Sequence, residues 1–89
     1  MLITDQYKLE LVDQLKKYST SISELEILSW AAYDYNKAYD YFWPNQYLKL
    51  YIQILEDSVK EGVELTEHET NHIIESAKEI VFYTLNITI

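Results

Sequence analysis

The sequence contains neither cysteine nor arginine. Without cysteine the chain has no disulfide bonds and no thiolate metal sites, which suits a reducing compartment. Without arginine it lacks the planar guanidinium that grips phosphates and carboxylates through paired hydrogen bonds. All seven basic residues are lysines, so we do not expect direct recognition of nucleic-acid phosphates.

Glycine and proline are also scarce, with one of each in 89 residues. Hydrophobic residues make up 48% of the chain, which is typical of a folding sequence rather than a disordered one. No apolar run is long enough to cross a bilayer, and the first residues lack the pattern of a secretion signal. We therefore expect one domain over residues 1–89 in the cytoplasm.

Acidic residues are in clear excess, with fifteen Asp and Glu against seven Lys and a formal charge of -8. Such a surface repels nucleic acid and anionic membranes, so we expect neither as a direct partner. A charged partner would be a basic protein. Acidity also keeps small proteins soluble, which is an alternative explanation of the same excess.

Apolar residues recur every three or four positions, which predicts an all-α protein. A first helix begins after Thr4 and buries Tyr7, Leu11, Leu15 and Tyr18. The segment YSTS then breaks the pattern, and Ser23 with Glu26 has the spacing of a capping box that starts a second helix. Pro44 ends this helix near Phe42, because a residue before proline is disfavoured in the helical conformation. The predicted buried residues of the second helix are Ile27, Leu28, Ala31, Tyr35, Ala38, Tyr39 and Phe42.

A third helix begins at Pro44 and carries polar residues on only a narrow strip, so we expect it to be central and covered on two sides. Gly62 stops it as a left-handed cap. A second capping box, Thr66 with Glu69, starts a fourth helix. The predicted buried residues of the fourth helix are Ile73, Ile74, Ala77, Ile80 and Val81. These boundaries predict a compact four-helix bundle.

The C-terminal sequence YTLNITI alternates apolar and polar residues, which is the period of a strand. A short strand there needs a partner edge, either the MLIT sequence at the other terminus or another protein. Alternatively, the fourth helix continues to the end of the chain.

The sequence HETNH, residues 68–72, fits the H-E-x-x-H pattern of zinc proteases. Helix geometry places His68 and His72 opposite the predicted buried stripe, facing solvent. Glu69 has a competing role in the capping box, and no third ligand is in view. We therefore assign no metal ligand, no cofactor and no catalytic residue.

Aromatic residues are concentrated in residues 29–51, which hold most of the nine tyrosines. Helix geometry predicts that Trp30, Tyr33 and Tyr41 project outward beside charged residues. Exposed aromatic rings among charges are typical of protein-binding surfaces, although a small bundle also places tyrosines at the rim of its core. The predicted partner-binding residues are Trp30, Tyr33, Asp34, Lys37, Asp40, Tyr41, Glu75 and Glu79.

Within residues 15–35, a capped Ile-Ser-x-Glu start precedes a Trp-Ala pair; the residues are Ile22, Ser23, Glu24, Trp30 and Ala31. This segment, about a quarter of the chain, resembles the opening of small bacterial toxin-immunity proteins of the colicin D and contact-dependent growth inhibition type. The resemblance implies an acidic helical bundle that binds and blocks a toxic nuclease.

The resulting hypothesis is a non-enzymatic, stoichiometric inhibitor that occludes a basic toxin. Its carboxylates would stand in for phosphates opposite the target's basic residues, and its exposed rings would anchor the contact. One alternative is a phage-type DNA mimic that inhibits a host restriction or CRISPR effector, as an anti-CRISPR does. Further alternatives are a zinc metalloenzyme and a self-associating module, and the protein is expected to be a monomer or a homodimer.

Overall fold

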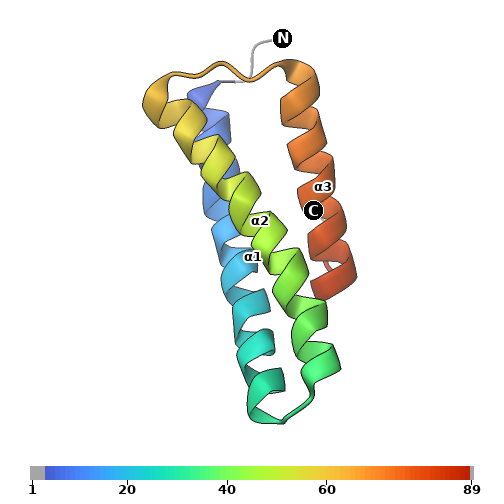
Figure 1. Ribbon diagram of the computed structural model, residues 1–89. Helices are drawn as coiled ribbons and strands as arrows, with labels where there is room; N and C mark the ends of the chain where they lie inside the picture. The colour runs from blue at the N-terminus through green and yellow to red at the C-terminus, as the bar shows by residue number, and fades with distance from the viewer. Residues whose placement is uncertain (1–3, 89) are drawn as a thin grey trace.

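The computed structural model describes residues 4–88, which form three α-helices. α1 (Asp5–Ala31) and α2 (Tyr35–Glu61) form a long antiparallel hairpin, and α3 (Glu67–Leu85) lies beside α2 (Figure 1). No strand occurs among the described residues. The prediction of a four-helix bundle is wrong, because residues 4–88 form an all-α structure of three helices.

The predicted break at residues 18–21 does not occur, because α1 continues through it. The hydroxyls of Thr20 and Ser21 donate to backbone carbonyls four residues earlier, so these polar side chains find partners within the helix. Ser23, the predicted N-cap, instead accepts a hydrogen bond from Asn45 of α2 at 2.8 Å. The predicted first helix and the start of the second are therefore one element.

The chain reverses at residues 32–34, in the middle of the predicted second helix. Tyr33 adopts a left-handed conformation with φ of 57°. The side chain of Asp34 caps α2 by accepting a hydrogen bond from the backbone N–H of Lys37 at 3.3 Å. Pro44 lies inside α2 and does not end it, since Ala38 and Leu48, on either side of it, are both fully buried and tertiary packing supplies most of the stability of a helix.

α1 and α2 pack along a seam with the spacing of a coiled coil. The buried residues of α1 are Lys8, Val12, Leu15, Ser19, Ile22 and Ser29. Those of α2 are Ala38, Asn45, Leu48, Ile52, Leu55 and Ser58. Three cross-helix hydrogen bonds interrupt the apolar seam. Besides the contact of Asn45 with Ser23, Ser19 Oγ donates to Asn45 Oδ1 at 2.7 Å, and Lys8 Nζ donates to Ser58 Oγ at 2.8 Å.

This seam differs from the core predicted for the second helix. Ile27, Leu28, Ala31, Tyr35 and Tyr39 are exposed, Phe42 is half-buried, and only Ala38 is buried. The predicted stripe assumes one continuous helix, whereas the turn at residues 32–34 divides these residues between two antiparallel helices. Their positions follow from which face of α1 meets which face of α2 along this seam.

The other local predictions are confirmed in part. Of the residues predicted to be buried in the first and fourth helices, Tyr7 is exposed, and four are only half-buried: Leu11, Tyr18, Ile74 and Ile80. Gly62 caps α2 with φ of 69°, and Thr66 with Glu69 forms the capping box of α3. α3 buries Ile73, Ala77 and Val81, with Thr70 added, and α2 is the central helix (Figure 1).

The predicted C-terminal strand is wrong over the described residues. α3 continues to Leu85, and Asn86 caps it in a left-handed conformation with φ of 56°. Residues 87 and 88 follow without forming a strand. Residues 1–3 and 89, which belong to the predicted strand pair, lie outside the described residues.

The molecule is elongated, with extents of 46 × 23 × 16 Å. Its radius of gyration is 14.1 Å, whereas a compact domain of this length would have about 12 Å. The two long helices set this length, and α3 covers only one side of them. No helix in residues 4–88 combines the length and apolarity that a membrane span requires.

Candidate protein-binding surface

Aromatic residues occupy every fourth position of α2 from Tyr35, its first residue, to Tyr51. We call this row the aromatic ridge; its members are Tyr35, Tyr39, Trp43, Tyr47 and Tyr51. Residues four apart are neighbours on a helix surface, and such a row is inclined to the helix axis. The aromatic ridge therefore winds around α2, from the hairpin turn beside α1 to the side that faces α3.

Most of the aromatic ridge is open to solvent. The exposed fractions are 54% for Tyr35, 50% for Tyr39, 58% for Trp43 and 56% for Tyr47. Tyr51 is half-buried and packs against the core. The aromatic ridge thus has four exposed rings, and only its last ring, Tyr51, is partly buried.

Trp30 of α1 supports the beginning of the aromatic ridge. Its ring centroid lies 5.8 Å from that of Tyr35 and 5.1 Å from that of Tyr39, the second in an edge-to-face arrangement. The indole N–H of Trp30 donates to Glu26 Oε2 at 2.9 Å, which fixes the ring. Trp30 is half-buried and does not project outward as predicted, because the rings of α2 cover it.

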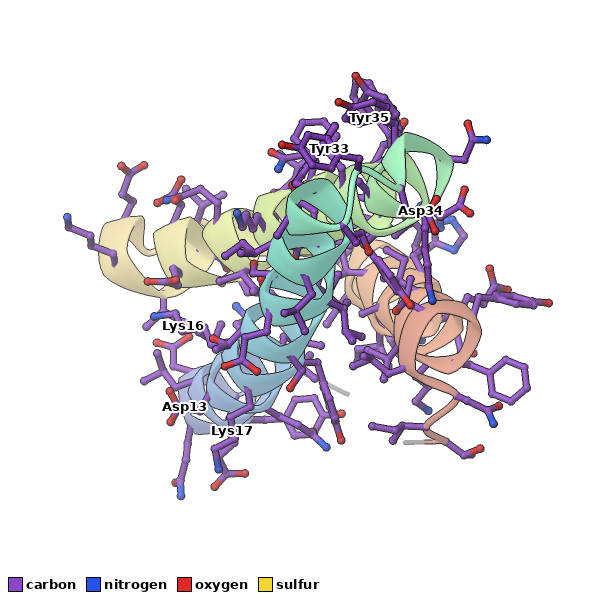
Figure 2. The ribbon with its side chains drawn as sticks, turned by 90° about the horizontal axis from the view of Figure 1, so that it is seen from below. Asp13, Lys16, Lys17, Tyr33, Asp34 and Tyr35 are labelled. Carbon is purple, nitrogen blue, oxygen red and sulfur yellow. The ribbon has the colours of Figure 1, made fainter. Side chains whose placement is uncertain are left out.

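Two further rings extend this surface. Tyr33, 78% exposed, lies 6.4 Å from Tyr35 between ring centroids, and Figure 2 shows the two tyrosines together at the hairpin turn. Phe42 connects Tyr39, at 6.4 Å, with Trp43, at 4.9 Å. Ring contacts of this kind are favourable beyond the area they bury, so the rings from Tyr33 to Trp43 that make them form one connected group.

The charged residues predicted to bind a partner do not all lie beside the exposed aromatic rings. Asp34, Lys37 and Tyr41 line one shallow hollow of about 250 Å³ near the turn. Asp34 lies to a different side of the hairpin from Tyr33 and Tyr35 (Figure 2). Tyr41 is half-buried against the core and does not project outward, since it falls on the side of α2 that faces α1.

The remaining predicted carboxylates are exposed. Asp40 belongs to the exposed surface of α2. Glu75 and Glu79 are on α3, and Glu75 pairs with Lys78 at 3.8 Å. Glu79 lines a groove between α2 and α3 together with Tyr47 and Tyr51 of the aromatic ridge. The structure therefore links Glu79, but not Glu75, to that row.

The residues of the H-E-x-x-H pattern lie at the start of α3. Both histidines are exposed. Glu69 Oε1 accepts hydrogen bonds from the backbone N–H of Thr66 at 3.4 Å and from its hydroxyl at 2.9 Å. The carboxylate that a zinc protease would direct at a metal-bound water is thus part of the helix cap. Within residues 4–88, no three His, Asp or Glu side chains come together as a set of metal ligands.

Sequence reasoning missed Trp43 and Tyr47 and assigned Tyr35 and Tyr39 to the core. The signal was present as an aromatic residue at every fourth position, but it extends across Pro44. A proline usually ends a helix, so the sequence pattern places the residues before and after Pro44 on different helices, whereas α2 continues through it.

No family model matches the chain, and neither the curated proteins nor the solved structures include a similar protein. The resemblance of residues 15–35 to toxin-immunity proteins stays a prediction.

Proposed function

We propose that this protein is a stoichiometric inhibitor that binds a basic protein, as toxin-immunity proteins do, and uses the aromatic ridge as its contact surface. The observation that carries the proposal is the row of four aromatic residues on α2 that are between 50% and 58% exposed. Exposed tyrosine and tryptophan side chains gathered along one helix are typical of a protein-binding site.

The chemistry of these rings suits tight association. Tyrosine and tryptophan bury a large area while few rotatable bonds are immobilised, and they dominate the energetic centres of protein interfaces. The contacts of Trp30 with Tyr35 and Tyr39 arrange the rings before a partner arrives. Such preorganisation lowers the entropic cost of binding.

The charge of the chain favours a basic partner. The formal charge is -8; Asp40 is exposed on the same helix as the aromatic ridge, and Asp34 is exposed at the cap of that helix. Opposite charge on a partner accelerates encounter and disfavours acidic competitors. The layout supports a protein inhibitor over a DNA mimic, because the exposed face of α2 carries a row of rings rather than a row of carboxylates.

The test begins with affinity capture of the tagged protein from its source cells, followed by purification of the retained partner. We expect a basic protein that binds one to one and loses its activity in the complex. Replacing Tyr39 and Trp43 together by alanine should weaken binding by at least about 2 kcal/mol, roughly thirtyfold in Kd, because hot-spot aromatic residues have effects of this size. Isothermal titration calorimetry measures the difference.

The matched control is Tyr7→Ala with Leu9→Ala. These side chains are 45% and 46% exposed, near the start of α1 and far along the hairpin from its turn. This variant should bind as the parent does. Equal weakening in both variants, or sedimentation showing a homodimer that depends on Trp43 and no other partner, would contradict the proposal.

A further inference from the structure

α2 and α3 enclose a groove of about 380 Å³. Its lining residues are Pro44, Tyr47, Tyr51, Ser76, Glu79, Ile80, Tyr83 and Thr84. One water molecule takes about 30 Å³ of liquid volume, so the groove has room for a side chain of several non-hydrogen atoms. Three tyrosines and one carboxylate are the groups that give this groove its chemical character.

Among the described residues, Glu79 is the only charged one that lines the groove. It makes no hydrogen bond or ion pair with the part of the chain that the structure describes, whereas Glu75, one turn earlier, pairs with Lys78. Its negative charge is therefore available to a ligand. The faces of tyrosine rings carry negative electrostatic potential and also attract cations.

We propose that this groove binds an arginine side chain of the partner, an inference that rests on the proposed function. Glu79 accepts hydrogen bonds from the guanidinium, and the rings of Tyr47, Tyr51 and Tyr83 flank its planar faces. Tyr47 and Tyr51 belong both to the aromatic ridge and to the lining of the groove. A partner bound along the aromatic ridge would therefore also contact the groove.

Arginine fits the groove better than lysine does. A guanidinium is planar, stacks on aromatic rings and pairs with a carboxylate through two parallel hydrogen bonds, whereas an ammonium is a compact and strongly hydrated charge. The 89 residues contain no arginine. An arginine in the groove therefore lies outside these residues, and we assign it to the partner.

The test uses N-acetylarginine amide as the probe and follows the tyrosine ring signals of the full-length protein by NMR. We expect weak, saturable shifts at Tyr47, Tyr51 and Tyr83. Glu79→Gln and Tyr83→Ala should each raise the Kd of the probe about two- to fivefold, in keeping with exposed ion pairs and cation–π contacts. Tyr83 is 81% exposed, so its replacement should not disturb the fold. N-acetyllysine amide should bind more weakly than the arginine probe.

Glu75→Gln is the matched control, since it removes one carboxylate from the same helix outside the groove and should leave the probe's Kd unchanged. Non-saturable shifts, equal binding of the two probes, or equal effects of Glu75→Gln and Glu79→Gln would overturn the inference. Failure of the groove assignment can be distinguished from failure of the proposed function. If a partner depends on Tyr39 and Trp43 but is indifferent to Glu79→Gln and Tyr83→Ala, only the groove assignment is wrong.

Discussion

Asn45 connects α1 and α2 through a fully buried side chain. Its Oδ1 accepts a hydrogen bond from Ser19 at 2.7 Å, and its Nδ2 donates to Ser23 at 2.8 Å. An apolar seam tolerates sliding of one helix along the other, whereas a buried amide is satisfied in one alignment only. Asn45 is therefore placed to fix the register of the hairpin, and with it the position of Trp30 beside the aromatic ridge.

We expect Asn45→Ala to lower the free energy of unfolding by about 2–3 kcal/mol, because it leaves two hydroxyls without this partner and opens a small cavity. Urea unfolding followed by circular dichroism measures the change. Gln46→Ala alters the exposed neighbour and should change stability by less than about 0.5 kcal/mol. A similar small effect at both positions would show that the amide contacts contribute little.

At the scale of the helices, the sequence predicts those features that depend only on neighbouring residues, such as helix caps. The caps at Thr4, Gly62 and Thr66 are found from sequence because each depends on a few neighbouring backbone groups. The helix boundaries in the first half of the chain are not found from sequence, since the packing of α1 against α2 outweighs local helix preferences. The real turn has no glycine or proline; Tyr33 takes a positive φ without a recognisable signal.

For the candidate surface too, some features can be predicted from the sequence, whereas others depend on how the helices pack. Its aromatic composition is evident from sequence, and so is the exposure of Tyr33. The burial of Tyr41 and Trp30 and the exposure of Tyr35 depend on which face of each helix meets the other. That pairing is set by contacts between residues far apart in the chain, which a local pattern does not contain.

Pro44 is the clearest conflict between local preference and packing within one helix. It cannot donate to the carbonyl four residues earlier, and its ring crowds that turn. We expect Pro44→Ala to raise the free energy of unfolding by about 1–3 kcal/mol, as proline is that much worse than alanine inside a helix. Lys49→Ala, at an exposed position of α2, should change it by less than about 0.5 kcal/mol. Lower stability of Pro44→Ala in urea unfolding would mean that the structure needs proline there.

The whole molecule combines a long two-helix seam with a third helix attached to one side. α3 packs chiefly against α2 and makes few contacts with α1, and its 19 residues compare with 27 in each of the others. One wall of the proposed arginine groove is α3, so the stability of its docking bears on ligand binding. Elements with fewer buried contacts open more readily than the rest of a protein.

We therefore expect native-state hydrogen exchange to show α3 amides opening at a free energy at least about 1 kcal/mol below that of the amides along the seam. NMR at increasing urea concentrations resolves the two groups. Val81 and Leu48 are both fully buried, in α3 and α2 respectively. Val81→Ala should speed exchange in α3 while the seam changes little, whereas Leu48→Ala should lower protection everywhere, because α3 has no support once the hairpin opens. A single opening free energy for all three helices would instead mean that the molecule unfolds as one unit, and that the groove is as rigid as the seam.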